Sequence, residues 1–140
     1  MRFLFSIVCI IAFTFSCKNN KASNLDLAQD LSDFQAFYER FHGDADYQLA
    51  HINFPLQGAP DNAANDPSYN DDFRWTKENW VINKPIDLEE TGFKRSLFPL
   101  GEDLIIEKLQ HESGGYEMQR RFSKVNGEWY LIFYAGLNPI

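Results

Sequence analysis

Apolar residues near the start of the globular part of the chain recur at the spacing of a helix. One face of this predicted helix carries them at intervals of three and four residues: Leu27, Leu31, Phe34, Tyr38 and Phe41. Asn24 is a suitable N-cap, and Gly43 is a suitable stop because glycine is favoured just after the last helical turn. Asp44 can cap a second, shorter helix that runs to about Ala50.

The last third of the chain alternates between apolar and polar residues and predicts three antiparallel strands, over 103–110, 116–124 and 128–135. Asn126-Gly127 indicates a tight hairpin because both positions tolerate a positive φ, and Ser113-Gly114-Gly115 supplies the other turn. Helices followed by a meandering sheet predict an α+β fold.

The chain between these two regions gives weaker signals. Ile52–Leu56 alternates like a strand, but Pro55 confines it to a sheet edge or to the end of a strand. Residues 58–72 are rich in Gly, Pro, Asn and Asp and predict a loop. No period is sustained over 73–99, so this stretch yields no defined element.

Two-residue turns in both hairpins determine which side chains of the three strands share a face. In this register Glu107 lies opposite Arg120, and Arg120 lies opposite Phe133 on the last strand. The same face carries mainly apolar and aromatic residues: Ile105, Leu109, His111, Tyr116, Met118, Phe122, Trp129 and Leu131. A charged pair therefore sits on a face that is patterned for burial.

Two interpretations of this pair remain open. In the first, Glu107 and Arg120 satisfy one another, or a helix carboxylate such as Asp33 or Asp44, because a buried hydrogen-bonded pair is tolerable whereas a single buried charge is costly. In the second, they line a pocket in which Arg120 binds a ligand carboxylate and Glu107 orients the guanidinium. The other candidates for that pocket are Tyr116, His111, Trp129 and Phe133.

The charge of the chain excludes some partners. It holds 13 Lys/Arg and 20 Asp/Glu, a net charge of −7, and it therefore lacks the basic face that nucleic acid or an anionic lipid surface requires. The three histidines show no metal-ligand spacing, and there is no phosphate-binding glycine loop. We predict neither a metal nor a cofactor. The acidic loop 59–72, together with Trp75 and Trp80, is an alternative contact for a protein partner.

The first 16 residues are typical of an export signal. A positive start precedes an apolar run over 3–15, which is shorter than the roughly 20 residues that a membrane-spanning helix needs. Thr14-Phe15-Ser16-Cys17 resembles the bacterial lipoprotein signal. The resemblance implies that Cys17 is acylated and anchors the protein in the membrane, and Lys18 in place of Asp implies the outer membrane. An ordinary secreted protein, cut at the same place, is the alternative.

Cysteine usage agrees with lipid attachment. Cys9 lies within the predicted signal, which leaves Cys17 as the lone cysteine of the exported chain, and a lone thiol in an exported protein needs an explanation. Residues 17–23 are polar and predict a tether, and residues 24–140 predict a single α+β domain.

A set of aromatic and polar residues over 34–56 resembles one protein family. These residues are Phe34, Phe37, Phe41, Asp44, Tyr47-Gln48 and Ile52-x-Phe54-Pro55-Leu56. They are similar to an uncharacterised family of bacterial proteins regarded as lipoproteins, with the nuclear-transport-factor-2-like cone fold. That fold curls an antiparallel sheet around a pocket closed by N-terminal helices. The superfamily contains isomerases, dehydratases and binding proteins, so the resemblance implies a fold and not an activity.

From these observations we expect a lipid-anchored envelope protein that is a non-catalytic binding module for a small anionic ligand or an envelope partner. The alternative is a small isomerase-like, dehydratase-like or hydrolytic enzyme. Such an enzyme would use Glu107 or His111 as a base and Tyr116 as a donor to an oxyanion.

Overall fold

A computed structural model describes the chain from Ala22 to Ile140, with side chains from Leu31 onward. The predicted signal peptide 1–16, the lipid-attachment residue Cys17 and most of the predicted tether 17–23 lie outside the described residues. Within the described residues, no helix is both long enough and apolar enough to cross a membrane.

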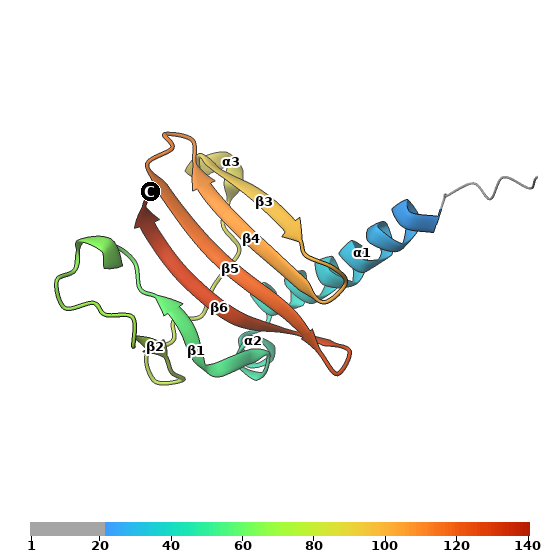
Figure 1. The fold of residues 1–140 in the computed structure, drawn as a ribbon, viewed down its shortest axis with the longest axis horizontal. Helices are drawn as coiled ribbons and strands as arrows, with labels where there is room; N and C mark the ends of the chain where they lie inside the picture. The colour runs from blue at the N-terminus through green and yellow to red at the C-terminus, as the bar shows by residue number, and fades with distance from the viewer. Residues whose placement is uncertain (1–21) are drawn as a thin grey trace, which may run out of the picture.

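Two helices open the described part of the chain, as the sequence predicts. α1 spans Ala22–Gly43 and begins two residues before the expected cap, and α2 spans Ala45–Ala50. Asp44 caps α2, since its Oδ1 accepts a hydrogen bond of 3.0 Å from the backbone N–H of Tyr47. The buried face of α1 is a row of three aromatic residues at intervals of three and four: Phe34, Phe37 and Phe41. The prediction that Leu31 joins this face is wrong, because Leu31 is 36% exposed. Figure 1 shows the N-terminal part of α1 extending beyond the sheet.

Six strands form one curved, unclosed sheet in the order β2-β1-β6-β5-β4-β3 (Figure 1). Their bounds are Ile52–Ala59 (β1), Arg74–Trp75 (β2), Phe93–Pro99 (β3), Leu104–His111 (β4), Tyr116–Val125 (β5) and Glu128–Pro139 (β6). β1 runs parallel to β6, and all other neighbours are antiparallel. The mixed α+β class and the three C-terminal strands are therefore confirmed.

The hairpin turn between β5 and β6 forms as predicted. Asn126 and Gly127 have φ of 52° and 85°, the left-handed conformation that a two-residue hairpin turn requires. This turn pairs Val125 with Glu128 and Phe122 with Leu131, as the sequence indicates.

The strand that contains Pro55 differs from its prediction. β1 lies between β2 and β6 rather than at the edge. Its register against β6 jumps from Ile52↔Leu131 to Gln57↔Phe133, which marks a bulge. Pro55 falls within that bulge, where a residue without an N–H removes no ladder hydrogen bond.

The region without a sequence pattern contains three short elements. β2 has two residues, α3 spans Leu88–Thr91 behind its cap Asp87, and β3 forms the far edge of the sheet. A short 3-10 turn, Ala63–Asn65, interrupts the predicted 58–72 loop. Elements this short carry too few residues to show a period.

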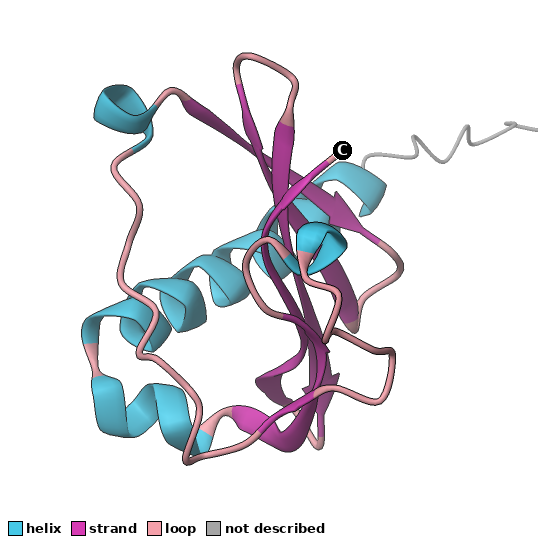
Figure 2. Ribbon diagram, turned by 90° about the vertical axis from the view of Figure 1, so that its left-hand side faces the viewer, coloured by secondary structure: helices cyan, strands magenta, loops and turns pink. Residues whose placement is uncertain are grey.

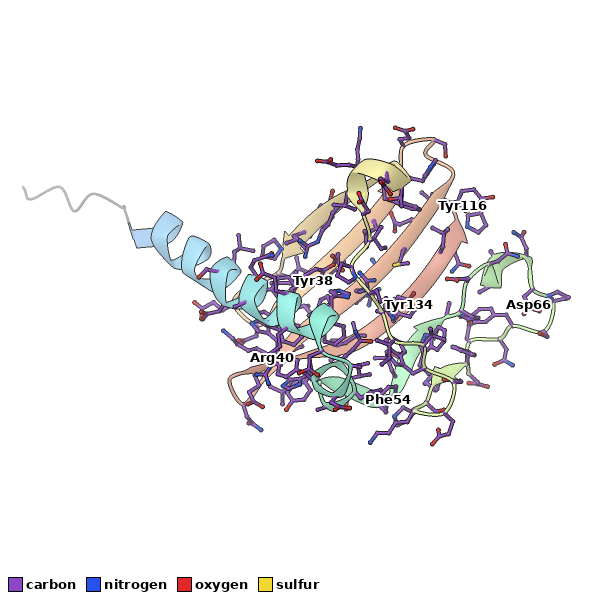
Figure 3. The ribbon with its side chains drawn as sticks, turned by 180° about the vertical axis from the view of Figure 1, so that it is seen from behind. Tyr38, Arg40, Phe54, Asp66, Tyr116 and Tyr134 are labelled. Carbon is purple, nitrogen blue, oxygen red and sulfur yellow. The ribbon has the colours of Figure 1, made fainter. Side chains whose placement is uncertain are left out.

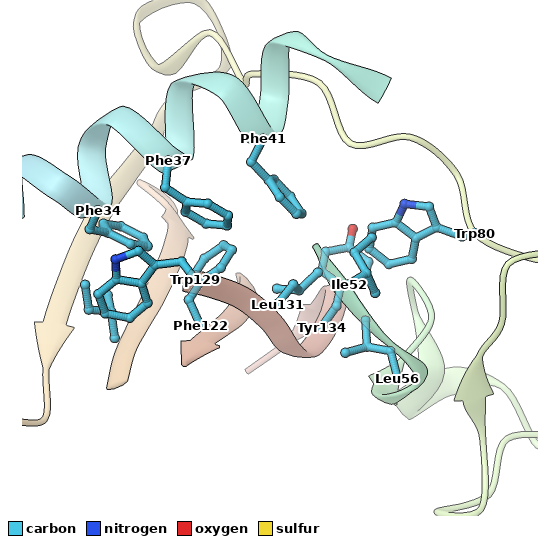
Figure 4. Close-up of a cluster of buried hydrophobic side chains, with 11 residues drawn as sticks. Phe34, Phe37, Phe41, Ile52, Leu56, Trp80, Phe122, Trp129, Leu131 and Tyr134 are labelled. Atoms are coloured by element: carbon cyan, nitrogen blue, oxygen red, sulfur yellow. The ribbon is translucent and has the colours of Figure 1, made fainter. Parts of the chain in front are cut away.

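α1 and α2 cover the same face of the sheet (Figure 2). The core lies between them and the sheet, where side chains of α1 meet those of β5 and β6 (Figure 4). Phe34 packs edge to face against both Phe122 and Trp129, with ring centroids 5.2 Å apart in each case. The core continues toward β1 through these members: Ile52, Leu56, Trp80, Leu131 and Tyr134.

Candidate functional site

The register between β4 and β5 places a carboxylate and a guanidinium together in the core, as the sequence predicts. Glu107 pairs with Arg120 across the strands, and the two residues are 0% and 1% exposed. Arg120 Nη1 donates to Glu107 Oε2 at 2.9 Å. The two charged residues therefore satisfy one another, as in the first of the two interpretations above.

A second arginine, which the sequence analysis did not identify, completes this group. Arg95 on β3 donates from Nε to Glu107 Oε1 at 2.5 Å, so each oxygen of Glu107 binds a different guanidinium. On β3, Arg95 lies opposite Leu109, and Leu97 lies opposite Glu107. Arg95 is therefore on the same face of the sheet as Glu107, diagonally across from it. We call Arg95, Glu107 and Arg120 the buried ion cluster. Its third member was missed because β3 lies in the stretch without a sequence pattern.

Tyr38 of α1 closes the buried ion cluster from the helix side. Its hydroxyl is hydrogen-bonded to Glu107 and accepts a long hydrogen bond of 3.5 Å from Arg120 Nη1, while the guanidinium of Arg95 lies 3.9 Å above its ring. Burial and the charge of Glu107 raise the pKa of Tyr38. Burial alone would raise the pKa of Glu107, but the charge and hydrogen bond of Arg120 outweigh it and lower that pKa. Tyr38 is therefore neutral and Glu107 is ionised.

The buried ion cluster has one more positive than negative charge. It contains two guanidinium groups and one carboxylate. His42, which packs against Tyr38 with ring centroids 4.4 Å apart, is neutral, because burial and the charge of Arg120 lower its pKa to about 4. No other carboxylate among the described residues forms an ion pair with Arg95 or Arg120. The side chain of Arg120 is 1% exposed and that of Arg95 is 20% exposed, so the excess positive charge lies partly in the core and partly at the surface.

A cleft of about 540 Å³ lies beside Arg120. One wall is the chain segment 80–86, which we call the strap, and which crosses the face of the sheet beside Tyr134 (Figure 3). Aromatic and apolar side chains, from the strap and from the sheet, form most of the lining: Trp75, Trp80, Ile82, Ile86, Met118 and Tyr134. Arg120 is the member of the buried ion cluster that lines the cleft, and Asp61 and Lys84 are exposed charges of opposite sign at its rim.

Gln48 of α2 holds the strap in place. This side chain is 0% exposed, and its Oε1 accepts from Trp80 Nε1 at 3.1 Å and from the backbone N–H of Asn83 at 2.8 Å. Its Nε2 donates to the carbonyl oxygens of Asn83 and Phe41, each at 2.8 Å. The Asn83 carbonyl also accepts from His42 Nδ1 at 3.1 Å. One buried glutamine thus fixes the backbone of the strap to both helices.

The strap in turn contacts Arg120. Asn83 Oδ1 accepts from Arg120 Nη2 at 2.9 Å. A guanidinium has five N–H donors, and the acceptors of Arg120 are Glu107, Tyr38 and Asn83. Its Nε is buried without a hydrogen-bond partner among the described residues. An unsatisfied buried donor costs about 1–3 kcal/mol, so this edge of Arg120 favours an added acceptor.

Two of the predicted pocket residues lie elsewhere. Trp129 is 4% exposed and packs under α1, with Lys124 Nζ 5.2 Å from its ring, and it does not line the cleft. Phe133 lies on the opposite face of the sheet, beneath the guanidinium of Arg121 at 4.3 Å.

A bulge in β6 explains the placement of Phe133. The register runs Phe122↔Leu131 and then Arg121↔Phe133, so β6 contains one extra residue. One extra residue reverses the faces beyond it. Tyr134, and not Phe133, therefore lies opposite Arg120 and lines the cleft. The register that the sequence predicts is therefore wrong beyond Leu131.

His111 and Tyr116 lie at the turn between β4 and β5, away from the cleft. His111 Nδ1 is 2.8 Å from Ser113 Oγ, and Tyr116 is 47% exposed. Four residues along β4 separate Glu107 from His111, roughly 13 Å. The structure therefore does not bring together the three residues that the enzyme hypothesis needs.

The tryptophans offered as a partner contact are largely covered. Trp80 is 8% exposed and packs edge to face on half-buried Trp75, with ring centroids 5.6 Å apart. Both line the cleft. Across the described part of the chain, no group of three or more His, Cys, Asp or Glu residues is placed to hold a metal ion.

Comparisons with known proteins give a family and distant structural likenesses. The model of an uncharacterised bacterial family matches residues 32–138. No curated protein matches the chain. Among solved structures, the association domain of C. elegans CaMKII is similar at 10% sequence identity, over 83% of this chain and 98% of that chain, with a TM-score of 0.37.

Proposed function

The chain belongs to this uncharacterised bacterial family, and from that premise we propose that it is a lipid-anchored envelope protein that binds a small anionic ligand in the cleft beside Arg120. Three features support the proposal: the charge of the buried ion cluster, the shape of the cleft and the N-terminal sequence.

The single observation that carries the binding proposal is the unbalanced charge of the buried ion cluster. Two guanidinium groups share one carboxylate, and Arg120, which lines the cleft, has an Nε without a partner. Buried charges are stable when they are paired and hydrogen-bonded. An anion in the cleft that reached Arg120 Nε would supply both a negative charge and an acceptor for this donor.

The cleft has the size and lining of a small-molecule site. Its volume of about 540 Å³ falls within the range of roughly 300–1,000 Å³ that is typical of ligand pockets, which combine apolar walls with a few polar groups. Trp75, Trp80 and Tyr134 offer ring surfaces to an apolar body. The expected ligand is therefore amphipathic, with its anionic end toward Arg120.

We propose binding rather than catalysis because Glu107, the acidic group of the site, is already paired with two arginines. A general base must be free to reach the proton that it abstracts. Both oxygens of Glu107 accept from guanidinium groups, and its pKa is lowered below its ordinary value.

The binding proposal is tested by titrating the purified protein with naphthoate in a calorimeter. Met118→Trp fills the cleft and is expected to abolish the heat of binding. Gln119→Trp, the neighbouring position on the opposite face of β5, is the matched control and is expected to bind normally. Equal binding by both variants, or no binding by the unaltered protein, would contradict the proposal.

The N-terminal sequence supports the proposed lipid anchor on Cys17. A membrane anchor of this kind needs more than one acyl chain, which the lipoprotein type of modification provides. We expect a labelled fatty acid fed to cells to enter the protein, and Cys17→Ala to lose the label and shift the protein to the soluble fraction. Label that persists in Cys17→Ala would refute the anchor.

We also propose the finer fold class, the nuclear-transport-factor-2-like cone. Its support is the sequence motif over 34–56, together with two N-terminal helices that cover one face of a curved six-stranded sheet. An experimental structure in which the sheet is flat, or in which α1 leaves it, would contradict this class.

A further inference from the structure

The side chain of Asn83 binds Nη2 of Arg120, a donor that the proposed ligand would also use. Arginine only donates hydrogen bonds, so the Asn83 atom 2.9 Å from Arg120 Nη2 must be the amide oxygen. The Nε–H and the nearest N–H of Nη2 point along one edge of the planar guanidinium, and a carboxylate can accept both. Asn83 accepts from Nη2, and Nε has no partner among the described residues.

The charges around the cleft suit a single negative charge. Asn83 is neutral, so it leaves the excess positive charge of the buried ion cluster in place. The two charged residues at the rim, Asp61 and Lys84, have opposite signs and together add no net charge. One carboxylate would bring the cluster to neutrality, whereas a dianion such as a phosphate monoester would leave a negative charge among apolar side chains, at a cost in desolvation.

The side chain of Asn83 can move while the strap stays in place. Gln48 and His42 bind the backbone of Asn83 and not its side chain. Apart from Arg120, the side-chain amide donates to the Val81 carbonyl at 3.2 Å, within the strap itself. A rotation of the Asn83 side chain would therefore expose the edge of Arg120 without releasing any strap contact to the helices.

We infer that the ligand is a monocarboxylate with an apolar body, and that its carboxylate displaces the Asn83 side chain from Arg120. This inference rests on the proposed function of the cleft. Asn83 then serves as a neutral placeholder that keeps Nη2 satisfied when no ligand is bound, and the aromatic walls contact the apolar body of the ligand.

The inference is tested with three naphthyl compounds that differ in the group presented to Arg120: naphthoate, naphthyl phosphate and naphthalenemethanol. Calorimetric titration of the purified protein is expected to show naphthoate binding at least about tenfold more tightly than either of the others, a difference of about 1.4 kcal/mol.

Asn83→Asp places a carboxylate of nearly the same shape on Arg120 permanently. We expect it to weaken naphthoate binding by at least about tenfold and to raise the midpoint of thermal unfolding by roughly 4 °C or more. Asn53→Asp makes the same substitution at an exposed position of β1 and is the control. It is expected to change neither quantity.

The outcomes separate the inference from the proposed function. If naphthalenemethanol or naphthyl phosphate binds as tightly as naphthoate, the cleft binds ligands but the monocarboxylate inference is wrong. If Asn83→Asp binds naphthoate normally, the displacement of Asn83 is wrong. If no naphthyl compound binds, the proposed function fails and the inference fails with it.

Discussion

At the scale of single residues, the stability of this protein depends on the two ion pairs that Glu107 forms. Its carboxylate accepts hydrogen bonds from Arg95 with one oxygen and from Arg120 with the other, and the side chain is fully buried. Breaking a buried ion pair by removing one partner costs far more than its formation contributes, because the remaining charge keeps its desolvation penalty.

Glu107→Gln should therefore destabilise the protein by about 3 kcal/mol or more, because two guanidinium groups lose the one carboxylate among the described residues that pairs with them. Chemical denaturation measures this free energy of unfolding. Glu117→Gln is the control, since it disrupts the partly exposed pair with Lys108, whose atoms are 2.9 Å apart, and such pairs contribute about 0–1 kcal/mol. Similar losses in the two variants would show that the charge on Glu107 is not critical.

His42 gives the protein a dependence on pH. Its pKa is about 4 in the folded protein and 6.5 ordinarily, because burial and Arg120 disfavour its charged form. The unfolded chain therefore binds the proton first as pH falls. Stability is complete above about pH 6.5 and is lost progressively down to about pH 4, by roughly 3 kcal/mol.

Unfolding measured between pH 7 and pH 4 should show this loss in the unaltered protein and a shallower slope in His42→Gln. An unchanged slope in His42→Gln would mean that other groups cause the acid sensitivity.

At the scale of elements, the sequence predicts the parts of the site that lie near a strong turn. The Asn126-Gly127 turn sets the register of β5 and β6 as far as Phe122↔Leu131, and the register of β4 and β5 gives the pair Glu107↔Arg120 correctly. The prediction fails beyond the bulge in β6, because one extra residue exchanges the positions of Phe133 and Tyr134 and no local residue type signals it.

The rest of the site comes from segments that show no period in the sequence. Arg95 lies on an edge strand, and Asn83 lies on a strap without regular structure. Their places follow from long-range contacts: Arg95 with Glu107, and the strap with Gln48. Such contacts depend on how the whole sheet and its helices assemble, which spacing along the chain does not reveal.

Gln48→Leu tests the attachment of the strap. The substitution removes every hydrogen bond that Gln48 makes to Trp80, Asn83 and Phe41, and it leaves buried donors and acceptors unsatisfied. We expect a loss of more than about 2 kcal/mol in unfolding free energy and a weaker affinity for naphthoate.

Gln57→Leu is the matched control at an exposed position of β1 and should change stability by no more than about 0.5 kcal/mol. If Gln48→Leu behaves like Gln57→Leu, the strap is held by packing alone and Gln48 does not position it.

At the scale of the whole molecule, the helices and the strap divide one face of the sheet between them. α1 and α2 cover the aromatic core, and the strap covers the region around Arg120 and Tyr134, where the cleft lies (Figures 2 and 3). The buried ion cluster thus lies between Tyr38 of α1 on one side and Asn83 of the strap on the other. The local positive charge of this region contrasts with the net charge of −7 of the whole chain.

The most direct test of this account is a crystal structure of the protein grown with naphthoate. The account predicts naphthoate in the cleft, with a carboxylate oxygen about 3 Å from Arg120 Nε and the Asn83 side chain turned away from Nη2. Naphthoate bound elsewhere, or bound in the cleft with its carboxylate facing solvent while Asn83 stays on Arg120, would contradict the account.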